Sequence, residues 1–301
     1  MSRVIQNQHE HARETGCGNV VRSLVVGVSL TFSVLPGPRA QSQQRVSSAF
    51  RQLVDKGVPS PPTDPLQQVR KDNTALAVVR SYQLAVGKAT WVDLEATGTI
   101  IPETLPQGKS ATQDATLQIL GHRGYRLDVE TPKGVISIRM DGGYGAMRPP
   151  GVHVIPMNAG DAATGLLAFP QLQDPSFPAS NVSLIDRGTV AVDGLHLHRI
   201  TVEIPWTDLA SKEQTRSGVS ITDLYFDPTS NLLVKSVNLP QGTDPRLARY
   251  IKVVTYGDYQ AVGSVQIPFH MVESLNGQLV WTLQLNHAQL NGGISEEVFK
   301  F

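Results

Sequence analysis

The feature that most constrains this chain is an alternation of apolar and polar side chains that recurs from Trp91 almost to the C-terminus. The segment 125–130, YRLDVE, alternates Tyr, Leu and Val with Arg, Asp and Glu. Successive residues of a strand point to opposite faces, so this period indicates strands with one buried face. Asp-Gly at 193–194 and Asn-Gly at 276–277 favour tight hairpins, because both turn residues need positive φ. The sequence predicts an antiparallel meander of roughly ten strands.

One segment before the alternation has a helical period. Leu76, Val79 and Tyr82 form an apolar stripe within residues 72–86, and Gly87 follows as a helix end. We therefore expect one helix of moderate length directly before the first strand, which makes the fold class α+β.

Two segments interrupt the strands. Residues 156–180 contain several prolines, and only 161–169 within them is predicted as a short helix. Residues 206–218 are polar and are predicted as a loop or wide turn. No internal repeat is visible, so we expect one domain over residues 72–301.

The N-terminal 40 residues are typical of a secretory signal peptide. Arg22 precedes an uncharged, mostly apolar run at 23–35, and Pro, Gly and Ala follow it, with cleavage expected after Ala40. The run is shorter than the ~20 residues that span a bilayer. A buried core helix is the alternative interpretation. Export predicts a periplasmic or secreted protein of a bacterial envelope, with no transmembrane span in the mature chain.

Residues 41–71 are predicted as a short helix followed by a proline-rich linker. Cleavage near Ala40 would remove Cys17, the only cysteine of the sequence. The mature chain would then have no disulfide and no thiol nucleophile.

The sequence contains no specific catalytic signature. Its 26 basic and 26 acidic residues give no electrostatic reason to expect a nucleic-acid partner. No nucleophile elbow, phosphate loop or zinc motif is present, so we predict neither an enzyme nor a cofactor. His196 and His198 share one strand face and are the best metal-ligand pair. A metal site needs three or four ligands, so two polar residues near a strand end are the simpler interpretation, and a metal-dependent hydrolase stays a lesser alternative.

The segment 224–237, LYFDPTSNLLVKSV, predicts a hairpin that is apolar on both faces. Leu224 and Phe226 point one way and Tyr225 the other, and Leu232 with Val234 are expected to oppose Leu233 with Val237. Such a hairpin belongs in the middle of a sheet, with a cavity or its lid on one side and a helix such as 72–86 on the other.

The turn of this hairpin has its own chemistry. Asp227 can bond the turn backbone, and Asn231 can take the left-handed position that closes the connection. The final strand, which includes Trp281, is apolar on one side only and orients the sheet.

Several stretches together resemble a known family. YQLAVGKATWVDLEATGTI, the proline-rich insertion, DLYFDPTSNLLVKSV and VVTYGDYQAVGSVQIPFHMVESLNG follow the order of the periplasmic lipoprotein-carrier superfamily with the LolA-like fold, especially its exported bacterial members. The resemblance implies a strongly curved antiparallel sheet, an open half-barrel, with helices over its concave side. It also implies binding of a lipid or acylated protein in that concavity, or a non-catalytic structural or sensor role with an envelope protein partner.

The strand pattern gives the candidate ligand-binding side chains. They are the apolar residues on the inward faces of the hairpin and of the final strand: Leu224, Phe226, Leu279, Trp281, Leu283 and Leu285.

Overall fold

The computed structural model describes eight stretches of the chain: 69–87, 91–103, 111–121, 124–141, 144–157, 159–208, 216–239 and 251–300. The predicted signal peptide (1–40) and all but the end of the predicted helix and linker (41–71) lie outside the described residues. The division of the chain into these three parts therefore stays a prediction.

One sheet of thirteen strands organises the described residues. Its order is β6-β5-β4-β3-β2-β1-β13-β12-β11-β10-β9-β8-β7, and every neighbouring pair is antiparallel. The strands are β1 (Asp93–Pro102), β2 (Gln113–Leu120), β3 (Gly124–Thr131), β4 (Gly134–Asp141), β5 (Tyr144–Arg148), β6 (Ile155–Pro156), β7 (Ser183–Val192), β8 (Leu195–Asp208), β9 (Arg216–Phe226), β10 (Leu233–Leu239), β11 (Lys252–Val262), β12 (Val265–Leu275) and β13 (Gln278–Leu290).

The helical elements are short. They are α3 (Asn73–Ala85), α4 (Ala159–Thr164), α5 (Phe169–Gln173) and the 3-10 helices η1 (Phe177–Ala179) and η2 (Glu296–Phe299). None of the described helices has the length and apolar character needed to cross a membrane.

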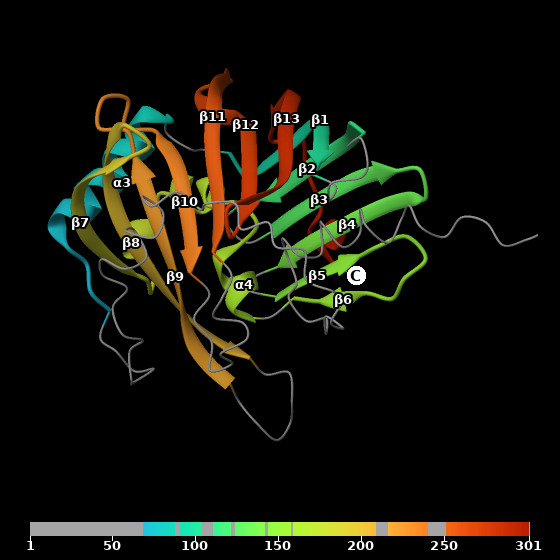
Figure 1. Ribbon diagram of the computed structural model, residues 1–301, viewed down its shortest axis with the longest axis horizontal. Coiled ribbons are helices and arrows are strands. Elements are labelled where there is room, and N and C mark those ends of the chain that lie inside the picture. The colour runs from blue at the N-terminus through green and yellow to red at the C-terminus, as the bar shows by residue number, and fades with distance from the viewer. Residues whose placement is uncertain are drawn as a thin grey trace, which may run out of the picture.

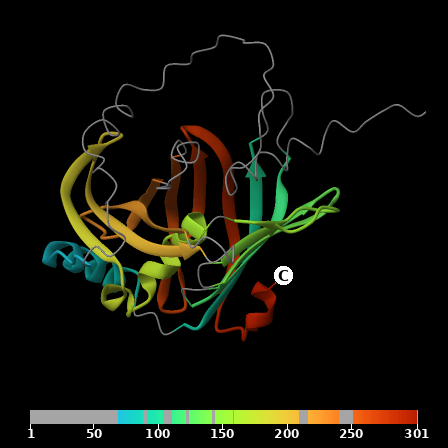
Figure 2. The same ribbon diagram turned by 90° about the horizontal axis from the view of Figure 1, so that it is seen from below.

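Within the described residues the sheet is open, because β6 and β7 each have only one neighbouring strand (Figure 1). It curls so that its two wings face each other, with α4 and α5 between them (Figure 2). The open, strongly curved antiparallel sheet that the resemblance implied is therefore confirmed, and the predicted strand count is too low.

Three strands, β5, β6 and β7, were not predicted from the sequence, for different physical reasons. β7 carries a bulge at Arg187 and Gly188, which interrupts its period of two. β5 is five residues long and follows a glycine-rich segment, and β6 is only two residues long and ends in Pro156. None of the three shows an uninterrupted alternation.

The predicted helix over 72–86 is confirmed as α3, but its start is built differently from a capped helix. Asp72 occupies the N-cap position, yet its side chain makes no cap hydrogen bond. Its carboxylate accepts instead from the backbone N–H of Asp186 at 3.0 Å and from Arg70 at 2.9 Å. The backbone N–H of Asp72 donates to the carbonyl of Leu184 at 2.9 Å, so the helix start is fastened to the edge strand β7.

The other end of α3 is fastened to the β11–β12 hairpin. The carbonyl of Val86 accepts from the N–H of Gln266 at 2.7 Å. Gly87 follows at φ +90°, and a Cβ there would lie 2.1 Å from the carbonyl oxygen of Ser264. Only glycine allows this close approach. The helix thus links the edge strand to the middle of the sheet.

The insertion between β6 and β7 forms two short helices instead of the single predicted helix over 161–169. Gly165, at φ +70°, ends α4, and Pro170 lies in the first turn of α5. A proline is tolerated there because the first turn has no intrahelical acceptor for its missing N–H. We refer to residues 159–179, which contain α4, α5 and η1, as the lid.

Candidate functional site

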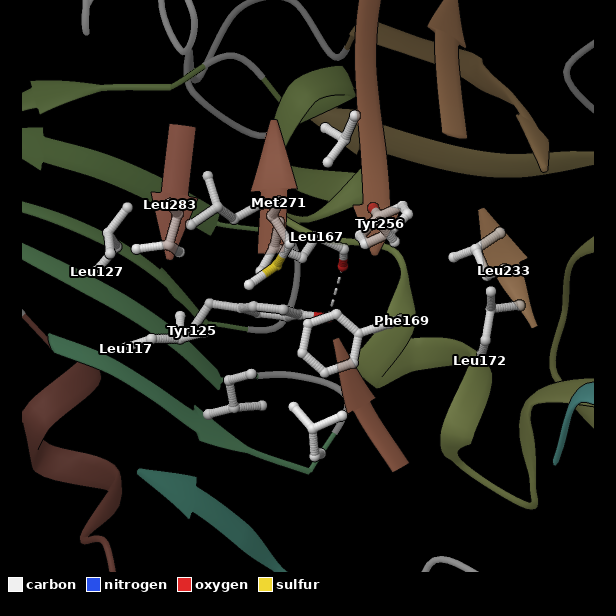
Figure 3. Packing of buried hydrophobic residues seen from close by; sticks show 14 of the residues in the cluster. Leu117, Tyr125, Leu127, Leu167, Phe169, Leu172, Leu233, Tyr256, Met271 and Leu283 are labelled. Atoms are coloured by element: carbon white, nitrogen blue, oxygen red, sulfur yellow. Dashed lines mark hydrogen bonds between the residues drawn. The ribbon is translucent and has the colours of Figure 1, made fainter. Parts of the chain in front are cut away.

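The lid closes the concave side of the sheet from wing to wing. α4 packs against β8 and β9 on one wing and against β5 on the other. α5 and η1 pack against α3. Beneath these elements, one apolar cluster extends across the sheet from Met147 of β5 to Leu184 of β7, and Figure 3 shows part of it. The apolar concave face is therefore continuous across both wings.

Five of the six candidate ligand-binding residues belong to this cluster. Leu224 and Phe226 come from β9, and Trp281, Leu283 and Leu285 come from β13. All five side chains are almost fully buried. The structure therefore brings together the inward faces of two strands that the sequence could describe only separately.

Leu279 does not share this environment and is 40% exposed. Glu273 of β12 pairs with Trp281, and Ser274 pairs with Leu279, which leaves Val280 as an extra residue of β13. A β-bulge of this kind reverses the side-chain alternation beyond it. The expectation that Leu279 and Trp281 point the same way is therefore wrong.

A second bulge lies in the 224–237 hairpin. Leu233 pairs with Phe226 and Lys235 with Tyr225, so Val234 is the extra residue. Leu233 joins the concave cluster, whereas Val234 packs on the opposite face. The predicted opposition of Val234 to Val237 is wrong for this reason, since both lie on the outer face.

The outer face of this wing carries a small cluster of its own. Val192, Leu197 and Tyr225 form this outer cluster, with Val190, Val234 and Val237 at its margin. Arg199 and Lys235 stand directly opposite Tyr225 on the neighbouring strands. Burial raises the pKa of Tyr225 to about 12.

The predicted position of the helix relative to the hairpin is also wrong. The ring of Tyr82 on α3 contacts the ring of Phe226, so α3 lies on the same side of the sheet as Leu224 and Phe226. Among the described residues, no helix packs on the outer cluster. The two apolar faces of the hairpin are buried by α3 on one side and by cross-strand side chains on the other.

Two tyrosines of the concave face hold the lid near α5. The hydroxyl of Tyr256 accepts from the N–H of Ala168 at 3.1 Å and lies 3.1 Å from the hydroxyl of Ser236. The hydroxyl of Tyr125 donates to the carbonyl of Leu167 at 3.4 Å (Figure 3). Burial raises the pKa of Tyr256 to about 12 and that of Tyr125 still further. Both therefore act at neutral pH as uncharged hydrogen-bonding groups.

The α4 end of the lid is held by polar side chains. The hydroxyl of Ser220 donates to the carbonyl of Gly160 at 2.8 Å. The amide nitrogen of Asn238 donates to the hydroxyl of Thr164 at 2.7 Å. These residues were missed, although the alternating polar positions of β10 were a signal that could have been read.

The two candidate histidines are not a metal site in the described part of the chain. His196 is exposed, and the Nε2 atom of His198 lies 2.8 Å from a carboxylate oxygen of Asp186 across the β7–β8 pair. Among the residues with described placement, no group of three or more His, Cys, Asp or Glu could hold a metal ion. The contact with Asp186 accounts for the position of the His198 side chain.

Comparison with known proteins identified solved structures of similar architecture. A LolA superfamily protein from Nitrosomonas europaea has a TM-score of 0.49 and 13% identity over 75% of this chain and 97% of its own. A domain from Vibrio parahaemolyticus described as an outer membrane lipoprotein-sorting protein has a TM-score of 0.48 and 13% identity over 75% and 95%. A DUF1329 family protein from Desulfovibrio piger has a TM-score of 0.47 and 11% identity over 79% and 98%.

The sequence itself has no comparable match. No family model matches the chain. No curated protein matches it either. The open, curved antiparallel sheet of the described residues is the fold that the resemblance in the sequence implied.

Proposed function

We propose that this chain is an exported protein of a bacterial envelope that holds a lipid or an acylated ligand between the concave face of its sheet and the lid. The export part of the proposal rests on the predicted signal peptide over residues 1–40. The binding part rests on the geometry of the lid.

One observation carries the proposal: a continuous apolar face is closed by helices too short to be stable alone. α4 has six residues, α5 has five and η1 has three. Isolated helices shorter than ~12 residues are marginal in water, so these elements depend on the sheet beneath them. Segments of low intrinsic stability are those that open locally and admit ligands.

The chemistry of the covered face suits a hydrocarbon guest. Most of its buried side chains are aliphatic or aromatic, with Leu117, Leu127, Met271 and Leu283 among them (Figure 3). Burying an acyl chain is worth about 0.8 kcal/mol per methylene. The free energy of burying a whole acyl chain is therefore large enough to offset the loss of the contacts between a small lid and the sheet.

A second candidate function uses the same face without a lipid. A non-catalytic structural or sensor protein would keep the lid closed and bind an envelope protein elsewhere. That alternative predicts no lipid uptake, so a binding experiment separates the two.

The test is displacement of a dansyl-labelled undecanoic acid by palmitate on delipidated protein. We expect saturable probe binding and competitive displacement. Leu283→Phe, which enlarges a buried side chain of the concave face, should weaken binding several-fold. Leu279→Phe makes the same change at an exposed position of the same strand and is the matched control. Absence of probe binding, or equal effects of the two variants, would refute the proposal.

A further inference from the structure

Several buried polar side-chain atoms of the described residues have no hydrogen-bond partner, and two of them face each other on the concave side of the sheet. These two are the hydroxyl of Thr222 on β9 and the amide oxygen of Asn238 on β10. The two residues are 8% and 6% exposed, and they stand directly opposite each other in the β9–β10 register. Nearly all buried polar side-chain atoms in folded proteins are hydrogen-bonded, so a facing pair of unbonded atoms needs an explanation.

The neighbouring polar residues show that the sheet is able to satisfy such groups. Ser220 donates to Gly160, and Ser236 bonds Tyr256. On the outer face of the adjacent strand, the hydroxyl of Thr201 lies 2.6 Å from a carboxylate oxygen of Asp223. On the described parts of β9 and β10, the buried polar side-chain atoms without such a bond are the hydroxyl of Thr222 and the amide oxygen of Asn238.

The pair lies where the lid meets the sheet. The other end of the Asn238 amide donates to Thr164, the last residue of α4. Lys252 stands opposite Asn238 on β11, and its ammonium group is 3.4 Å from the carbonyl of Gly165. The two unbonded atoms therefore lie at the α4 end of the concave face.

We infer that Thr222 and Asn238 bind the polar end of the ligand and select acyl compounds whose first polar group carries an O–H or N–H. The free amide oxygen of Asn238 is an acceptor only, so it requires a donor from the ligand. The hydroxyl of Thr222 can accept from or donate to the same group. This inference rests on the proposed lipid-binding function and adds the class of ligand to it.

Three probes of equal chain length test the inference by displacement of the dansyl-labelled undecanoic acid. Monopalmitoylglycerol offers hydroxyl donors, palmitamide offers N–H donors, and methyl palmitate offers none. We expect one or both donor compounds to bind about tenfold more tightly than methyl palmitate, the order expected for one net hydrogen bond. The comparison of the first two shows whether a hydroxyl or an amide is preferred.

Thr222→Val and Asn238→Leu should bring the ratio of the affinity for the donor compounds to that for methyl palmitate towards one, while methyl palmitate still binds. Thr222→Val should leave the melting temperature unchanged or raised, because it removes an unbonded buried hydroxyl. The matched control is Thr201→Val, which removes a bonded hydroxyl from the outer face and should lower the melting temperature without changing the preference.

The outcomes distinguish selection of the polar group from lipid binding itself. Equal affinity for all three probes, or a preference that survives both variants, overturns the inference and leaves lipid binding intact. Failure of every probe, methyl palmitate included, overturns the proposed function and the inference with it.

Discussion

The ring of Tyr82 on α3 meets the ring of Phe226 on β9 edge to face, with centroids 5.6 Å apart and planes at 60°. This contact places the helix on the concave side of the sheet. It also means that Phe226 is covered by the protein's own helix, while Leu224 lies two residues earlier on the same strand.

The pair should be energetically coupled. Edge-to-face aromatic pairs contribute about 1 kcal/mol beyond the area that they bury. In a double-mutant cycle of Tyr82→Leu and Phe226→Leu, we expect urea unfolding to give a coupling free energy of about that size. Combining Tyr82→Leu with Tyr225→Leu, on the outer face, should give additive effects, and coupling there would contradict the assignment of the two faces.

The lid should depend on the hydroxyl of Tyr256. Tyr256→Phe leaves the N–H of Ala168 without this acceptor, which should cost about 1–2 kcal/mol in the free energy of unfolding. The lid should also become more sensitive to proteolysis. Unchanged stability and unchanged cleavage would show that the lid is held by other contacts.

Alkaline pH should unfold the protein through its buried tyrosines. The pKa of Tyr256 is raised to about 12 by burial, so its contribution to stability is complete below pH ~10, the pKa in the unfolded chain, and is lost as pH rises towards 12. Urea midpoints measured between these pH values should fall less steeply in Tyr256→Phe than in wild type. If the urea midpoint of Tyr256→Phe falls with pH as steeply as that of wild type, ionisation of Tyr256 is not the cause of the alkaline destabilisation.

The carboxyl group of Asp227 in the hairpin turn should have a pKa below that of an ordinary aspartate. The hydroxyl of Ser230 donates to the Asp227 carboxylate at 2.6 Å, and the N–H of Thr229 donates at 3.1 Å. These bonds lower the pKa of Asp227, so its stabilising effect is lost as pH falls through that lowered value. Ser230→Ala removes the largest cause and should raise the pKa of Asp227, measured by NMR titration. Ser236→Ala, far from the turn, is the control and should leave that pKa unchanged.

Sequence reasoning succeeded where one local signal decided the structure. The helix over 72–86 follows from a 3.6-residue period ended by Gly87. Asp227 bonds the turn backbone as predicted, and Asn231 adopts φ +59°. The fold class could be predicted because the alternation and its turns repeat many times.

Sequence reasoning failed where a single inserted residue changed the pattern. The bulges at Val234 and Val280 reverse which side chains face inward, and no feature of the local sequence indicates them. Three strands were missed because bulges, glycines or short length hide their period. The polar residues Thr222 and Asn238 gained meaning only when pairing placed them side by side under α4.

On the proposed function, the lid must open before a lipid can enter beneath it. A disulfide between Gly160→Cys and Ser220→Cys, in a Cys17→Ser background, would fasten α4 to β9 where their side-chain and backbone atoms already bond. We expect the oxidised protein to exclude the dansyl-labelled undecanoic acid and the reduced protein to bind it like the Cys17→Ser parent. Equal binding by the oxidised and reduced forms would contradict entry beneath the lid.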